Sequence, residues 1–100
     1  MGFDFSMGGG SVKVTRHAKR RWRERVRDPP PQALELSADM WHSAQNVVAP
    51  EADCDESRIY PIPGKSDMLL CGKHDASGVS IATVLYADYS RIRDAEQGDF

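Results

Sequence analysis

The sequence predicts an α+β fold, with a helical hairpin packed on a three- or four-stranded antiparallel sheet. Apolar residues recur at helical spacing between residues 16 and 44, and then form short extended runs between residues 58 and 86. Proline-rich and glycine-containing stretches separate these segments. Helical periodicity followed by extended runs is typical of helices that cover one face of an antiparallel sheet.

The first helix is expected over residues 16–27. Thr15 is a suitable N-cap for it, and residues 28–31, an aspartate and three prolines, end it because a residue before proline disfavours helical geometry. One side of this helix carries an apolar seam at i, i+4 and i+8, formed by Ala18, Trp22 and Val26.

A second helix is expected over residues 31–44, opening on the last of the prolines and completing the hairpin. Its apolar face is supplied by Ala33, Leu36, Met40 and Ala44, with Trp41 beside them.

The rest of the chain is predicted to be mostly extended. Residues 11–14 are strand-like, and residues 45–57 are interpreted as an acidic loop. Three strands follow at 58–63, 68–74 and 79–86, joined by turns at 64–67 and 75–78. The prolines of the first of these strands favour a place near the sheet edge, and the β-branched last strand favours the centre.

The 100 residues suffice for one small domain. We expect a flexible arm at residues 1–10, a single α+β domain at 11–88 and a polar tail at 89–100, with a short helix over about 89–95 as an option.

Composition excludes several classes of function. No apolar run is long enough to span a membrane and no export signal is evident, so a cytoplasmic protein without membrane contact is expected. Free thiols are the favoured state of the two cysteines, although a disulfide remains open. No metal site and no cofactor are expected, because the candidate ligands are scattered at Cys54, Cys71, His42 and His74.

The charge is unevenly distributed. The net charge is −2, yet residues 11–30 hold eight Lys or Arg against two carboxylates, and residues 31–100 hold five against twelve. A basic element on an acidic body offers a polyanion such as RNA one place to bind. The alternative is that the basic helix binds acidic segments of this chain or of a partner. The outward-facing candidates for nucleic-acid contact are Arg16, Lys19, Arg20 and Arg23, with Lys73 from the predicted sheet.

A second row on the first helix combines His17, Arg21 and Arg25 at i, i+4 and i+8. Arginine binds phosphate oxygens bidentately, and histidine exchanges a proton near neutral pH. Cleavage of RNA by its own 2′-hydroxyl needs proton transfer and charge stabilisation, which this row provides without a metal. A further catalytic group is expected from the sheet, where the candidates are Tyr60, Lys73, His74 and Tyr86.

The segment "TRHAKRRWRERV" resembles the "HAxxRxxxR" opening of small bacterial and phage proteins related to the BrnT and RelE type toxins, which are mRNA interferases. The order of elements agrees over about residues 12–88, and "IATVLY" takes the place of the family's closing strand. The resemblance implies a RelE-like fold, and roles for His17, Arg21 and Arg25 in catalysis. It also matches Thr83 and Tyr86 to the closing strand. The sequence departs from the family at Trp22 and at "RVRDPP", where a glycine turn is usual.

Three functions remain open. The first is a metal-independent endoribonuclease of the toxin type, with a cognate antitoxin as a partner. The second is a non-catalytic phage or mobile-element protein that binds nucleic acid, a nucleotide or a host protein through the same helix. The third is a structural role, for instance in a virion, which exposed Trp41 or Tyr89 would favour.

Overall fold

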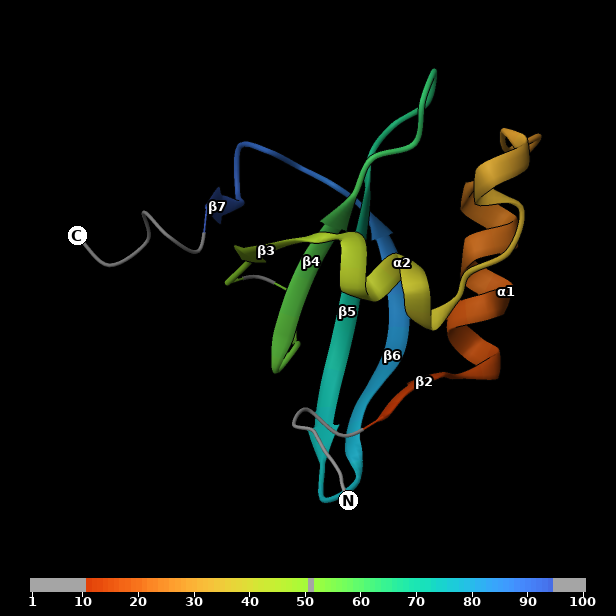
Figure 1. Ribbon diagram of the computed structural model, residues 1–100. Helices are drawn as coiled ribbons and strands as arrows, with labels where there is room; N and C mark the ends of the chain where they lie inside the picture. The colour runs from red at the N-terminus through yellow and green to blue at the C-terminus, as the bar shows by residue number, and fades with distance from the viewer. Residues whose placement is uncertain (1–10, 51, 95–100) are drawn as a thin grey trace.

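The computed structural model describes residues 11–50 and 52–94 (Figure 1). Its elements, in chain order, are β2 (Ser11–Val14), α1 (Arg16–Arg25), the 3₁₀ helix η2 (Pro31–Ala33), α2 (Ala38–Ser43), β3 (Gln45–Val48), β4 (Glu56–Tyr60), β5 (Met68–Asp75), β6 (Gly78–Tyr86) and β7 (Arg93–Asp94). The predicted arm at residues 1–10 lies outside the described residues.

The described strands form one sheet in the order β2-β6-β5-β4-β3-β7. The α+β class is confirmed, but the prediction of three or four antiparallel strands is wrong. The sheet has six strands, the last of only two residues, and it is mixed, because β2 runs parallel to β6 while the other pairs are antiparallel. The pairing of β2 with β6 stops at Ile81, so this side of β6 has no strand partner from residue 82 onward within the described chain.

Helix α1 forms where the sequence predicts it and ends slightly earlier. The hydroxyl oxygen of Thr15 accepts a hydrogen bond from Ala18 N at 3.1 Å and donates to Ile81 O at 3.0 Å, which caps the helix and ties it to β6. After the helix, Asp28 takes a positive φ of 50°, a conformation that aspartate tolerates better than most residues. The predicted seam is confirmed: Ala18, Trp22 and Val26 are buried against the sheet.

The predicted second helix over 31–44 is wrong as a continuous element, and the helical hairpin is therefore not confirmed. The segment forms η2, a bend and the short helix α2, with Ser37 at its N-cap position. All four residues of the predicted apolar face are nevertheless buried: Ala33, Leu36, Met40 and Ala44.

The core lies mainly between the two helices and one face of the sheet. It includes both tryptophans, together with Met68 and Leu70 of β5. Leu69, which lies between those two residues and so points to the other face, belongs to a smaller cluster with Val47 and Ile59. Both faces of the sheet thus carry buried side chains.

Several sequence predictions for the second half of the chain are corrected. The segment 45–57 is not a loop throughout, because β3 and the start of β4 fall inside it. Strand β4 lies inside the sheet between β5 and β3 rather than near the edge, and it ends before Pro61. Within 89–94 the chain forms a turn and β7 instead of a helix. Strands β5 and β6 form as predicted.

The expectation of free thiols is also wrong. Cys54 and Cys71 are joined in a disulfide, which links the chain just before β4 to the middle of β5. None of the helices in the described part of the chain is both long and apolar enough to traverse a membrane.

Candidate functional site

Arg25 and Tyr86 meet where the end of α1 crosses the unpaired side of β6. The Nε of Arg25 donates to Val84 O at 2.9 Å, and its guanidinium lies 5.5 Å from the centre of the Tyr86 ring. The Tyr86 hydroxyl in turn donates to Arg25 O at 3.2 Å. The helix thus brings the last cation of the predicted row onto the predicted closing strand.

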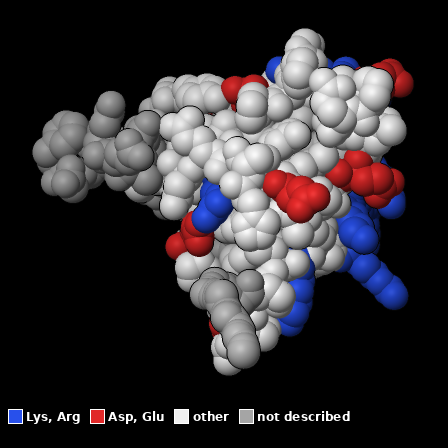
Figure 2. Space-filling view, in the orientation of Figure 1, with Lys and Arg blue, Asp and Glu red and all other residues white. Residues whose placement is uncertain are grey.

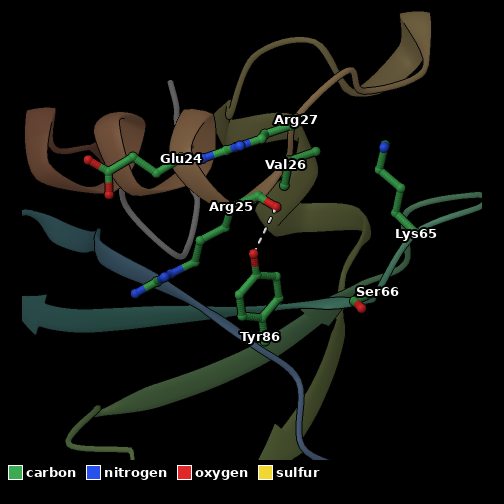
Figure 3. A pocket seen from close by; sticks show the side chains of 7 residues that line it. All are labelled: Glu24, Arg25, Val26, Arg27, Lys65, Ser66 and Tyr86. Carbon is green, nitrogen blue, oxygen red and sulfur yellow. Dashed lines mark hydrogen bonds between the residues drawn. The ribbon is translucent and has the colours of Figure 1, made fainter.

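A cleft of about 400 Å³ opens beside this pair (Figure 3). Arg25, Arg27 and Lys65 contribute three cations to its lining, against the single carboxylate of Glu24. Lys65 approaches from the β4–β5 turn, on the opposite side of Tyr86 from the Arg25 guanidinium (Figure 3). The cleft is therefore suited to an anion.

His17 and Arg21 do not line this cleft. Because an α-helix rises 1.5 Å per residue, the row from His17 to Arg25 extends over about 12 Å, and only its last member reaches the cleft. Arg21 forms an ion pair with Glu24, with its NH1 2.8 Å from Oε1. His17 is exposed at the other end of α1. The row is thus present on the helix, but its three side chains do not share one recess.

The outward-facing cations of α1 form the basic face that the charge distribution predicts. Arg16, Lys19, Arg20 and Arg23 are all exposed, and blue side chains gather over α1 in Figure 2. Arg23 lies 3.7 Å from Glu35 in a pair that is well exposed on both sides. Such exposed pairs add little stability.

The other sheet candidates lie away from the cleft. Lys73 and His74 pair with Ser80 and Val79, near the end of the β5–β6 hairpin opposite Tyr86. Lys73 is 3.8 Å from Asp53. Tyr60 packs instead against the Trp22 ring, with 6.3 Å between the ring centres. Among these candidates, only Tyr86 lines the Arg25 cleft.

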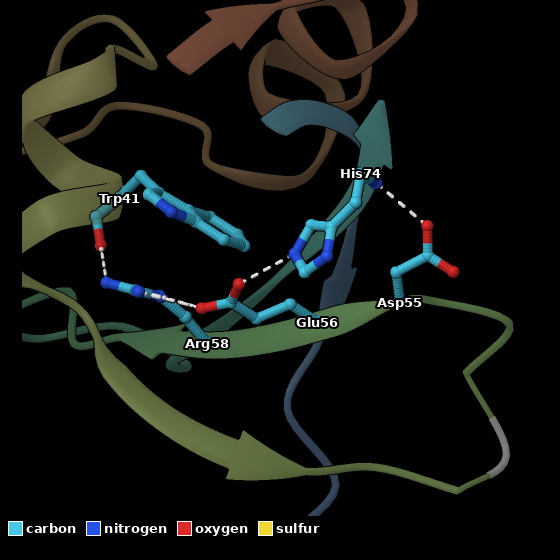
Figure 4. A network of polar contacts seen from close by, with 5 residues as sticks. All are labelled: Trp41, Asp55, Glu56, Arg58 and His74. Atoms are coloured by element: carbon cyan, nitrogen blue, oxygen red, sulfur yellow. Dashed lines mark hydrogen bonds and ion pairs between the residues drawn. The ribbon is translucent and has the colours of Figure 1, made fainter. Parts of the chain in front are cut away.

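A second polar cluster lies near that opposite end of the hairpin (Figure 4). Glu56 binds Arg58 through Oε2 at 2.7 Å and His74 Nε2 through Oε1 at 2.9 Å. Arg58 also donates to Trp41 O at 2.9 Å, and its guanidinium lies 4.7 Å from the centre of the Trp41 ring. Burial alone would raise the pKa of Glu56, but the hydrogen bonds from His74 and Arg58 outweigh it and hold the pKa below its ordinary value. This cluster joins α2, β4 and β5.

Sequence reasoning missed Arg27 and Lys65 as lining residues. Lys65 belongs to "GKSD", which forms the predicted turn between β4 and β5 and not a phosphate-binding loop. No periodicity links a turn residue to a helix, so only the folded chain brings Lys65 to the cleft. In the described residues, no three metal-ligating side chains come together in a group that could bind a metal ion.

A scan against protein-family models matches residues 14–88 to the family described as "Putative RelE superfamily toxin domain". Neither a curated protein nor a solved structure matches the chain. The matched range runs from the last residue of β2 to just past β6, and so includes α1, Lys65 and Tyr86.

Proposed function

Because the chain belongs to this family of RelE superfamily toxin domains, we propose that it is a toxin-type, metal-independent endoribonuclease. RNA is bound along the basic face of α1, and one of its phosphates lies in the Arg25–Tyr86 cleft. The observation that carries this proposal is the Arg25 guanidinium, fixed between Val84 O and the Tyr86 ring at a cleft that Arg27 and Lys65 also line. A cation held in place before the substrate arrives stabilises a charged transition state without reorganisation.

The reaction proposed is transesterification within the RNA. The 2′-oxygen forms a bond to the adjacent phosphorus, the bond from phosphorus to the 5′-oxygen breaks, and a 2′,3′-cyclic phosphate and a 5′-hydroxyl result. Arg25, Arg27 and Lys65 stabilise the charge that builds up on the phosphate oxygens. Tyr86 turns its hydroxyl proton from Arg25 O to the leaving 5′-oxygen and donates it there. Water at the open side of the cleft takes the proton of the 2′-hydroxyl.

The test is cleavage of end-labelled RNA by the purified chain, with and without a chelator. We expect the chelator to have no effect, Arg25→Ala to lower the rate by about 10²- to 10³-fold, and Tyr86→Phe to lower it by about 10²-fold or more. Arg20→Ala is the matched control, since it removes an exposed arginine of the same helix outside the cleft. It is expected to weaken RNA binding and to leave the rate at saturating RNA unchanged.

Absence of cleavage by the wild-type chain, or equal effects of Arg25→Ala and Arg20→Ala on that rate, would contradict the proposal. His17→Ala separates the roles within the row. A fall in rate at saturating RNA would assign His17 to proton transfer, and a fall in affinity alone would assign it to RNA binding.

One observation favours the second function, a binding module without catalysis. Both arginines of the predicted catalytic row are engaged within the chain, Arg21 with Glu24 and Arg25 with Val84 O. The exposed cations of α1 would then carry the function alone.

A toxin domain also makes an antitoxin a candidate partner, and an acidic surface on that partner could bind the same face.

Salt dependence distinguishes RNA from a protein as the partner of this face. Each phosphate contact releases counterions, so log Kd for RNA is expected to rise steeply and linearly with log salt. Arg16→Ala and Arg20→Ala should each lower the slope by about one. A flat salt dependence, measured by fluorescence anisotropy with a labelled RNA, would contradict RNA binding through these residues.

A further inference from the structure

A second cleft lies on the other side of the Arg25–Tyr86 pair and differs from the first in chemistry. Its volume is about 360 Å³, and Arg25 and Tyr86 are the two lining residues that the clefts share. The rest of its lining is mainly apolar, with Ala49, Ala52, Leu69, Leu85 and Ile92. All five of these residues belong to the cluster on the face of the sheet opposite α1.

The unpaired side of β6 explains why the two clefts adjoin. Strand β2 leaves β6 after Ile81, so no strand of the described chain shields Val84 and Tyr86 on that side. Arg25 starts on the helix face of the sheet and bonds to Val84 O, and its side chain reaches the cleft on the opposite face. Arg25 and Tyr86 therefore form a ridge with a cationic cleft on one side and an apolar cleft on the other.

The apolar cleft has anchored walls. Ala52 N donates to Ala49 O at 3.0 Å, and Cys54 N donates to Ala52 O at 2.8 Å. Cys54 is joined to Cys71 of β5, so the turn that carries the two alanines is tied to the sheet. On the rim, Asp88 and Arg91 form an ion pair, with 3.5 Å between Arg91 Nε and Asp88 Oδ2. A mainly apolar recess with a few polar groups at its rim is typical of a site for a small molecule.

A nucleotide has the same two parts as this pair of clefts, a compact anion and a flat, largely apolar ring. Single-stranded RNA presents its bases unstacked, and proteins bind such bases in recesses next to cations that hold the backbone. We infer that the apolar cleft is a base-binding subsite, which holds one RNA base while the neighbouring phosphate lies at Arg25 in the cationic cleft. This inference rests on the proposed function, because it takes RNA as the ligand of the same site.

The experiment compares two ligands of equal charge that cannot be cleaved. One is a 2′-deoxy trinucleotide, and the other has the same sugars and phosphates without bases. We expect the full chain to bind the first about tenfold more tightly, as burial of a single base allows. Ala52→Leu, which fills the cleft, and Ile92→Ser, which removes apolar wall, should each bring this ratio to within about twofold of unity, with the affinity for the abasic ligand unchanged.

Leu34→Ser is the matched control for Ile92→Ser, because Leu34 is an exposed apolar residue that does not line the cleft. It should retain the tenfold ratio. Equal binding of the two ligands by the wild-type chain, binding of neither, or a ratio that survives both cleft variants would overturn the inference. Since neither ligand has a 2′-hydroxyl, failure of the proposed RNA cleavage does not alter this comparison, and the two failures are distinguishable.

Discussion

Gly72 allows Trp41 to lie against the sheet. The residue occurs at an irregularity in the β5–β6 pairing, and a Cβ built on it would lie 2.5 Å from Trp41 Cη2 and 3.0 Å from Val79 Cγ2. Trp41 cannot easily move away, because Arg58 lies over its ring and bonds to its carbonyl oxygen. We expect Gly72→Ala to lower the free energy of unfolding by about 1–3 kcal/mol, as overpacking of a core does. Urea denaturation measures this change.

The same contact supplies the control for that prediction. Trp41→Phe shortens the ring that meets Gly72, so the double variant Trp41→Phe, Gly72→Ala should be more stable than the sum of the two single changes predicts. Strict additivity would show that the loss in Gly72→Ala does not arise from contact with Trp41.

At the same scale, the sequence predicts part of the candidate site. The row of His17, Arg21 and Arg25 follows from helical spacing, and Tyr86 is one of several sheet candidates. The structure brings Arg25 and Tyr86 together, since α1 runs beside β6. It does not bring His17 to them, because i+4 spacing fixes a direction around the helix while the row also advances along it. The places of Arg27 and Lys65 in the cleft lining depend on tertiary structure, so no sequence pattern predicts them.

At the scale of elements, α1 depends on its N-cap. Thr15 Oγ1 serves both Ala18 N and Ile81 O, so this one side chain starts the helix and ties it to β6. Thr15→Ala is expected to cost about 1–2 kcal/mol in the free energy of unfolding, and Thr15→Ser, which keeps the hydroxyl, should recover most of the loss. Thermal unfolding followed by circular dichroism measures both variants. Equal losses in the two variants would contradict a role for the hydroxyl.

Elements with one strong local signal were predicted well, and those with mixed signals were not. The N-cap, the apolar seam and the prolines all indicate the helix α1, and the β-branched residues indicate the strand β6. The segment 31–44 shows the limit of periodicity. Its apolar residues are buried as predicted, yet a 3₁₀ turn, a bend and a short helix bury them as well as one long helix would. Strand β3 has four residues, of which only Val47 is buried, so its sequence shows no alternation of apolar and polar residues that would indicate a strand.

At the scale of the whole molecule, long-range pairing sets the site. The parallel pairing of β2 with β6 joins residues that are 67 positions apart, such as Val12 and Val79. This pairing ends at Ile81, so the side of β6 that Arg25 crosses is left without a strand partner in the described chain.

The disulfide between Cys54 and Cys71 has a sequence separation of 17, and closing a loop of this size stabilises a fold by about 3 kcal/mol in the chain-entropy description. The sequence favours free thiols and misses this disulfide, because cysteine count and composition do not show which cysteines become neighbours in the fold.

The cluster around Glu56 makes the stability of the molecule depend on pH. The pKa of Glu56 lies below its ordinary value of 4.5 in the folded chain, because Arg58 on β4 and His74 on β5 both bind its carboxylate. A lowered folded-state pKa means that this stabilisation is fully present above about pH 5 and is lost as the pH falls through the folded-state pKa.

Glu56→Gln removes the charge at every pH. Its loss of unfolding free energy relative to wild type should therefore be largest near pH 6 and should shrink as the pH falls towards 3. Urea denaturation of both chains across this range measures the difference. Glu35→Gln is the control, since the ion pair of Glu35 with Arg23 is well exposed and its loss should change the stability little. A difference between wild type and Glu56→Gln that stays constant from pH 6 to pH 3 would mean that the carboxylate of Glu56 does not link α2, β4 and β5 through its charge.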